Sequence, residues 1–174
     1  MIRSVYPSQK GFTLIELLVV IAIVAVIASV VVILVNPLEI MRKSRDTTRL
    51  QDLNGVMKSV QLGLQDNTGS GQAFLCHNTT APCTGVSNAV GDMRINDGTG
   101  WVKVNLAALT NVSVVTLPVD PVNDATYFYT YQSDGTNYEF NMVLESGANQ
   151  TKMENDGGDN PAVYEIGSSL TVIN

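Results

Sequence analysis

The clearest feature of the apolar and polar pattern is a nineteen-residue stretch, Leu17 to Val35, with no charge and only Ser29 as a polar interruption. At about 1.5 Å of rise per residue, a helix of this length covers the roughly 30 Å hydrocarbon core of a bilayer. A secretory signal peptide needs a shorter apolar stretch, of about 7 to 15 residues, followed by a small-residue cleavage site. Asn36-Pro37-Leu38-Glu39 offers no such site. The pattern therefore predicts a membrane-spanning helix.

A second helix is predicted after Asn36-Pro37, where proline removes a backbone donor and disfavours helix at the preceding residue. We expect a kink or a locally melted turn there. Beyond it, apolar residues recur at alternating gaps of three and four, which is typical of an amphipathic helix. We expect this helix to lie along a sheet and to end near Asp66. A coiled coil is the alternative, but two heptads are too few to sustain it. The apolar positions are Leu50, Leu53, Met57, Val60 and Leu64.

The remaining chain changes from loop-like to strand-like composition. Residues 67 to about 100 are rich in Gly, Asn and Thr, and predict loops that begin with a turn at 67–71. Val104 to Leu109 predicts one short helix or strand. Strands are expected at Val112 to Leu117, Thr126 to Gln132, Asn137 to Leu144 and within Ala162 to Ile173. Asp134-Gly135, between two alternating runs, predicts a hairpin. The fold class is α+β, with a long N-terminal helix packed on a small antiparallel sheet.

Aromatic residues gather around this hairpin. A ligand-binding or electron-conducting cluster is one interpretation, but alternating aromatics on strands more often form cross-strand packing in a core, which we favour. The residues are Tyr127, Phe128, Tyr129, Tyr131 and Tyr138.

Charge narrows the classes of function. The formal net charge is −6, and segment 67–174 has three cations, Arg94, Lys103 and Lys152, against eleven acids. An acidic surface repels phosphate, so we predict no nucleic-acid partner for this acidic domain. His77 is the sole histidine, and neither a nucleophile-histidine arrangement nor a phosphate-binding loop is evident. We therefore predict that the protein is not an enzyme.

Cys76 and Cys83 are separated by six residues in a polar stretch. In an oxidising compartment this spacing predicts one loop-closing disulfide, and in a reducing one it leaves two thiols. His77 lies beside Cys76, but these ligands are too few for a four-ligand zinc site. We favour the disulfide.

Glu16 lies at the edge of the apolar stretch. An ionised side chain within a membrane costs a few kcal/mol, and such acids usually have a partner. Glu16 either marks the membrane interface, with the span starting at Leu17, or makes a contact inside the membrane. The apolar pattern alone leaves both open.

The neighbours of Glu16 favour the second interpretation. Lys10-Gly11-Phe12-Thr13-Leu14-Ile15-Glu16-Leu17, followed by the aliphatic run, resembles the processing motif of type IV prepilins and pseudopilins. The resemblance implies cleavage between Gly11 and Phe12 by a prepilin peptidase, methylation of the new Phe12 amine, and a role for Glu16 in assembly. Buried in a filament, the Glu16 carboxylate needs a cation, which the Phe12 amine of an adjoining subunit would supply.

This resemblance sets the expected domains and location. Residues 1–11 are a cleaved leader, 12–35 a transmembrane and assembly helix, 36–66 the amphipathic half of the helix, and 67–174 a globular pilin-like domain. The protein is expected in the cytoplasmic membrane with its N-terminus in the cytoplasm, then in a cell-surface or extracellular filament. Its expected partners are copies of itself in a helical homo-oligomer, the prepilin peptidase and a pilus assembly platform. The alternatives are a major pseudopilin of type II secretion and a membrane-tethered binding module.

The distribution of basic residues points against this topology. The leader has Arg3 and Lys10, whereas Arg42, Lys43, Arg45 and Arg49 follow the span. The positive-inside rule therefore favours the opposite orientation. We give more weight to the processing motif, because the leader must face the cytoplasm to be cut.

A second resemblance concerns the C-terminal half. Leu117-Pro118-Val119-Asp120-Pro121, the aromatic cluster and the Ser133-Asp134-Gly135 turn look like the layout of major pseudopilins, a family with a calcium site near its C-terminal loop. Glu154, Asp156 and Asp159 lie in an acidic, glycine-rich loop that could offer oxygen ligands to calcium. Their spacing fits no calcium loop that we can derive, so we favour a solvated acidic turn and expect no required cofactor.

Overall fold

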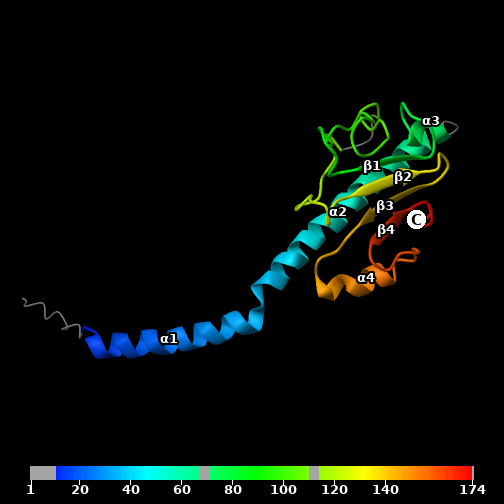
Figure 1. The fold of residues 1–174 in the computed structure, drawn as a ribbon. Coiled ribbons are helices and arrows are strands. Elements are labelled where there is room, and N and C mark those ends of the chain that lie inside the picture. Colours follow the sequence, from blue (N-terminus) through cyan, green and yellow to red (C-terminus); the bar gives the residue numbers. More distant parts are fainter. Residues whose placement is uncertain (1–10, 67–70, 110–113, 174) are drawn as a thin grey trace, which may run out of the picture. The chain divides into compact units, whose positions relative to one another are not determined.

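The computed structural model describes residues 11–66, 71–109 and 114–173, and it contains two compact units, Met1–Ile40 and Met41–Asn174 (Figure 1). Helix α1 spans Leu14–Val35, and helix α2 spans Pro37–Asp66. Asn36, between them, has a left-handed backbone with φ of 44°. Asparagine tolerates this conformation better than most residues, and Pro37 brings no N–H to continue the first helix. The predicted interruption is therefore confirmed, and α2 extends to Asp66, after which residues 67–70 lie outside the described residues.

The buried face of α2 repeats at steps of three and four residues, as an amphipathic helix requires. We call the buried stripe of α2 its seam. Of the apolar positions predicted to form it, Leu53 and Val60 are fully buried, and Leu50, Met57 and Leu64 are half-buried. The seam is rotated slightly from the predicted one and continues toward the N-terminus through polar positions. Its buried residues are Asp46, Arg49, Leu53, Val56, Ser59, Val60 and Gly63.

Four antiparallel strands form the sheet, in the spatial order β1-β2-β3-β4 (Figure 1). Their ranges are β1 Cys83–Val86, β2 Thr130–Ser133, β3 Tyr138–Met142 and β4 Tyr164–Gly167. The predicted hairpin joins β2 to β3, with Ser133 opposite Tyr138. Gly135 has φ of 92°, and the Asp134 carboxylate accepts the N–H groups of Thr136 and Asn137 at 2.7 and 2.6 Å. The predicted α+β class, hairpin and final strand are thus confirmed.

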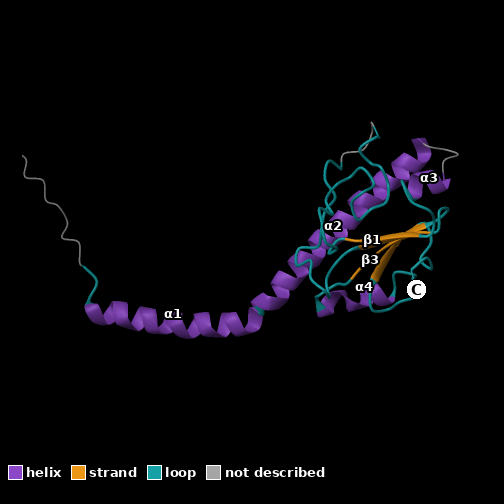
Figure 2. Cartoon of the chain, turned by 45° about the horizontal axis from the view of Figure 1, so that its top comes forward, coloured by secondary structure: helices purple, strands orange, loops and turns teal. Residues whose placement is uncertain are grey.

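The loop-like region after α2 contains two elements that the sequence did not predict. Helix α3 spans Gly71–Leu75, and β1 pairs with β2. Residues 67–70 of the predicted turn lie outside the described residues. Between β3 and β4, the 3-10 helix η1 spans Gly147–Asn149 and helix α4 spans Gln150–Glu154. The described residues between β1 and β2 are drawn as loop in Figure 2.

Two elements predicted in the long connection between β1 and β2 do not form, so these predictions are wrong. Val104 to Leu109 forms neither a helix nor a strand, and the described residues 114–117 form no strand, while 112 and 113 lie outside the described residues. The apolar residues there anchor loops instead: Leu106 and Leu117 are buried, and their N–H groups donate to the carbonyls of Asn96 and Arg94 at 2.8 Å. Short apolar runs do not distinguish an anchored loop from a strand.

Two predicted strands are shorter than expected. Thr126 to Gln132 becomes a strand only at Thr130, because the Asp124 carboxylate accepts the N–H groups of Thr126 and Tyr127 and forms a turn. Asn137 to Leu144 is reduced to Tyr138–Met142.

Aromatic side chains occupy the centre of the second unit. Trp101 is fully buried and contacts Tyr129 and Phe140, with ring centroids 5.7 and 5.8 Å apart. Tyr131 packs on Phe140 at 5.1 Å. Gly85 in β1 leaves space for the Trp101 backbone, whose carbonyl oxygen would lie 2.1 Å from an added Cβ atom. The preferred interpretation of the aromatics as core packing agrees with this arrangement.

Candidate functional site

Helix α1 contains a candidate membrane span, Leu14–Val32, with a mean hydropathy of 3.1 and no residue buried within the chain. The large apolar side chains described in α1 are each at least 48% exposed. There are sixteen of them from Leu14 to Val35, so leaving them in water would cost on the order of 10 to 25 kcal/mol. That exceeds the stability of many whole domains. The helix therefore needs an apolar environment outside its own unit.

The N-terminus of α1 is closed by a capping box formed by Thr13 and Glu16. The Thr13 backbone N–H and hydroxyl both donate to Glu16 Oε2 at 2.8 Å, and the Glu16 N–H donates to Thr13 Oγ1 at 3.3 Å. This reciprocal pattern satisfies backbone donors that a helix start leaves without partners. The carboxylate thus has a defined position at the first turn.

The predicted processing residues lie directly before this cap. Gly11 precedes the helix, and an added Cβ atom there would meet nothing within 4 Å. Phe12 is 88% exposed. The side-chain hydrogen bonds of Glu16 come from Thr13, a residue to which the sequence analysis gave no role. The Thr-x-x-Glu spacing is a helix-capping signal that would have identified it. The assigned roles of Gly11, Phe12 and Glu16 stay predictions.

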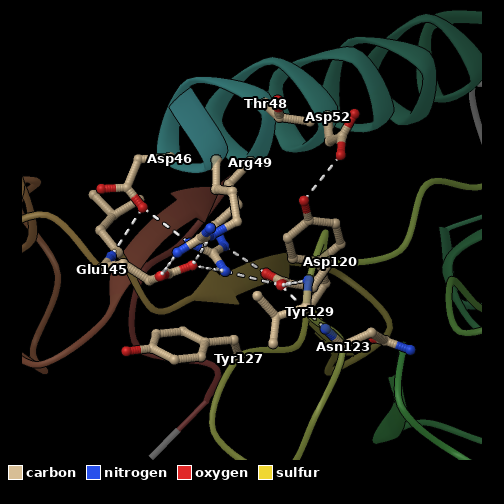
Figure 3. Close-up of polar contacts among 12 residues, drawn as sticks. Asp46, Thr48, Arg49, Asp52, Asp120, Asn123, Tyr127, Tyr129 and Glu145 are labelled. Carbon is tan, nitrogen blue, oxygen red and sulfur yellow. Dashed lines mark hydrogen bonds and ion pairs between the residues drawn. The ribbon is translucent and has the colours of Figure 1, made fainter. Parts of the chain in front are cut away.

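A buried ion network attaches α2 to two distant segments of the second unit (Figure 3). The Arg49 guanidinium donates to both carboxylate oxygens of Asp120, from Nε at 2.6 Å and from Nη2 at 2.9 Å. It also contacts Asp46 at 3.0 Å and Glu145 at 2.7 Å. Arg45 forms a second ion pair with Glu145. A two-point arginine-carboxylate contact fixes direction as well as distance.

The acids of the network are themselves held by backbone groups. Asp46 accepts the N–H groups of Glu145 and Ser146 at 2.8 and 2.9 Å, and Asp120 accepts that of Val122 at 2.8 Å. Burial alone would lower the pKa of Arg49, but the hydrogen bonds and charges of Asp120 and Glu145 raise it above its ordinary value. The hydrogen bond from Arg45 holds the pKa of Glu145 below its ordinary value, against the effect of burial.

None of these residues was predicted from the sequence to belong to a site. Counting back from Leu53 in steps of four and three leads to Arg49 and Asp46, so the helical seam was a usable signal. Asp120 lies 71 residues beyond Arg49 in the sequence, and Glu145 lies 99 residues beyond Asp46. No local pattern connects them to α2.

The other predicted site residues lie elsewhere in the second unit. Cys76 and Cys83 form a disulfide, in agreement with the interpretation of their spacing. Glu154 ends α4 and is exposed, as is Asp159. Both carboxylate oxygens of Asp156 accept backbone N–H groups, those of Gly158 and Glu165. Within residues 11–66, 71–109 and 114–173, no group of three or more His, Cys, Asp or Glu side chains is arranged to hold a metal.

Comparison with known proteins gives one match. Residues 6–32 match the family model described as the prokaryotic N-terminal methylation motif. No curated protein and no solved structure matches the chain. The matched segment carries the signature of type IV pilins and pseudopilins, and it contains the first turn of α1 and the whole candidate membrane span. The chain therefore carries the N-terminal motif and apolar helix that support a type IV pilin-like or pseudopilin precursor anchored in a membrane.

Proposed function

We propose that this protein is the structural subunit of a type IV pilus-like filament. The observation that carries the proposal is the match of residues 6–32 to a methylation motif over a helix whose apolar side chains are exposed. The proposal makes this helix the anchor in the cytoplasmic membrane before assembly. Prepilin peptidase cuts between Gly11 and Phe12, and an assembly platform then adds the subunit to the filament.

The proposed assembly exchanges one apolar environment for another. In the membrane, lipid covers the exposed side chains of α1, and in the filament the helices of adjoining subunits do so. Lipid and aliphatic side chains are similarly apolar, so this exchange supplies little hydrophobic driving force. Close packing of the helices and polar contacts that form only between subunits therefore decide whether assembly is favourable.

Glu16 supplies such a contact in this proposal. In the lone subunit its carboxylate accepts two hydrogen bonds from Thr13, which reduces the cost of keeping it at the start of the span. Enclosed by helices, the carboxylate retains its charge only with a cation beside it. The methylated amine of Phe12 on an adjoining subunit is that cation, since cleavage leaves it at the same end of the helix.

Replacing Glu16 tests the proposal. Glu16→Ala, as the sole copy of the gene, should leave insertion and cleavage intact and remove most filaments, while Glu16→Asp should have a weaker effect. Filaments are counted by electron microscopy of the sheared fraction, and mature protein is measured by blotting membranes. Intact-mass analysis of the membrane fraction should give a chain that begins at Phe12 with a methylated amine.

Glu39→Ala is the matched control, because it removes an equal charge just beyond α1 and should leave the filament yield unchanged. A normal yield of filaments from Glu16→Ala would overturn the proposed role of the carboxylate. A retained leader in assembled filaments would overturn the proposed processing between Gly11 and Phe12. The absence of filaments made by the wild type would overturn the filament assignment, and a membrane-tethered binding module would then be the better interpretation.

A further inference from the structure

The two faces of the sheet differ in chemistry. Side chains alternate between the faces along a strand, and directly paired residues share a face. Tyr131 pairs with Phe140, which pairs with Ile166, and these residues belong to the hydrophobic core or pack against it. On the opposite face, Asn141 pairs with Glu165, and Glu139 pairs with Gly167. Glu139, Asn141 and Glu165 therefore share the second face, together with Thr130 and Gln132 of β2.

The three side chains from β3 and β4 are buried, although they are polar. Glu139, Asn141 and Glu165 are 0%, 8% and 2% exposed, respectively. Each also has a side-chain oxygen with no hydrogen-bond partner among the described residues: Oε1 of both glutamates and Oδ1 of Asn141. Buried polar atoms are nearly always partnered, because leaving one without a hydrogen bond costs roughly 1 to 3 kcal/mol. Three such atoms on one face indicate that something binds there.

The second oxygen of each carboxylate is fixed by backbone donors. Glu139 Oε2 accepts the N–H groups of Val172 and Ile173 at 2.8 and 3.0 Å. Glu165 Oε2 accepts the N–H group of Asn160 at 3.3 Å. The free oxygens are therefore carried by groups whose positions are already set. Asn141 and Glu165 are direct cross-strand neighbours, and the diagonal from Glu139 to Glu165 of about 7 to 8 Å is within reach of long side chains.

No ion pair to a cation among the described residues neutralises this cluster. Within the described part of the chain, none of the ion pairs involves Glu139 or Glu165. Instead, the acidic side chains of Glu139, Asp156 and Asp159 lie close enough to Glu165 to interact with it electrostatically. A pair of buried carboxylates without a counterion is costly unless a cation binds or one of them takes up a proton.

We propose that Glu139, Asn141 and Glu165 form a binding site for a hard divalent cation, with Ca²⁺ as the best match. Carboxylate and amide oxygens are its preferred ligands, and it completes a shell of six to eight oxygens with carbonyls or water. Two carboxylates balance its charge. Only two of the three donors are acidic, so the site is consistent with the absence of a three-acid cluster in the described residues.

This site differs from the acidic loop Glu154, Asp156 and Asp159. Asp156 uses both carboxylate oxygens for backbone N–H groups, and Glu154 and Asp159 are exposed. A cation on the sheet face would instead connect β3 and β4. Through the fixed second oxygens, it would also hold residues 172–173 and the loop before β4 against the sheet. The inference does not depend on filament assembly.

Calcium titration of the full chain, purified in detergent and freed of metal with a chelator, tests the site. Isothermal titration calorimetry of the wild type should show saturable Ca²⁺ binding in the range of about 10⁻⁴ to 10⁻³ M or tighter, as in other extracellular calcium modules. Glu139→Gln and Glu165→Gln should each weaken binding by at least about tenfold. Ca²⁺ should also raise the melting temperature of the wild type, because it binds only the folded state.

Glu154→Gln is the matched control, since it removes an equal charge from the nearby loop and should leave Ca²⁺ affinity unchanged. Fluorescence of the sole tryptophan, Trp101, reports whether each variant is folded before titration. The absence of saturable binding by the wild type up to about 10 mM, well above the module range, would overturn the proposal. Loss of binding in Glu154→Gln with retention in Glu165→Gln would also overturn it and assign calcium to the loop.

Discussion

Arg49 offers the sharpest test of what holds α2 in place. Its guanidinium is the cation shared by Asp46, Asp120 and Glu145, and its side chain is fully buried. Arg49→Gln removes the charge while leaving the three acids where they are. We expect this change to destabilise the second unit strongly, with little effect on α1 as a membrane span.

The magnitude follows from what remains after the substitution. Glu145 keeps its ion pair with Arg45, and Asp46 keeps its backbone donors. Asp120 loses both guanidinium contacts, at 2.6 and 2.9 Å, and remains buried with backbone donors alone. Removing one partner of a buried ion pair typically costs about 3 to 5 kcal/mol. Arg49→Lys keeps the charge but loses the two-point contact, so about half that loss is expected.

Urea unfolding of the full chain in detergent, followed by Trp101 fluorescence, measures these changes. Trp101 is the sole tryptophan and is fully buried in the core of the second unit. Lys58→Gln is the control, because Lys58 is an exposed cation on the same helix, and its loss should change the unfolding free energy by less than about 0.5 kcal/mol. A loss below about 1 kcal/mol for Arg49→Gln would refute the conclusion that the network is a major constraint on α2, since it would lie within the range of a single ordinary hydrogen bond.

Two further predictions concern the same unit. The pKa of Glu145 is held below its ordinary value by Arg45, so its contribution to stability is complete above about pH 4.5 and is lost as pH falls through the lower, folded-state pKa. Urea midpoints measured from pH 6 to 2.5 should therefore fall less steeply in Glu145→Gln than in the wild type, and parallel curves would contradict this assignment. Replacing Cys76 and Cys83 together by serine should lower the unfolding free energy by about 2 to 3 kcal/mol. Non-reducing peptide mapping of the wild type should recover the linked pair, whereas free thiols at both positions would show that the loop is held in another way.

Local chemistry explains which parts of the fold could be predicted from the sequence. The break at Asn36 and the Asp134-Gly135 hairpin each depend on residues within a few positions, so composition was sufficient. The long connection between β1 and β2 was harder, because Leu106 and Leu117 are as apolar as strand residues but anchor loops in the core. Strand β1 was missed because Cys83–Val86 lacks alternation and forms a strand through pairing with β2.

The candidate sites also differ in whether their residues are close together in the sequence. The first turn of α1 is a local motif, so Gly11, Phe12 and Glu16 could be selected from the sequence. The oxygen cluster of Glu139 and Glu165 needs the register of β3 and β4, which brings together residues that are 26 positions apart. From the sequence, only the acids of a continuous loop, Glu154, Asp156 and Asp159, could be considered as calcium ligands, and a solvated acidic turn was favoured there, because only continuous ligands are visible without a register.

Two polar residues of the α2 seam, Arg49 and Asp46, constrain the position of the helix along its axis in a way that apolar residues would not. Well-packed apolar residues of similar volume often equal or exceed a buried ion pair in stability, so stability alone does not account for Arg49 and Asp46. Apolar side chains at steps of three and four, however, offer similar contacts after a shift of one turn, about 5.4 Å along the axis. Such a shift would break every contact of Arg49, which are 2.6 to 3.0 Å long, and would separate Asp46 from the backbone donors of Glu145 and Ser146. The network therefore fixes the axial position of α2 against the loops that contain Asp120 and Glu145, while Leu53 and Val60 supply the apolar contact.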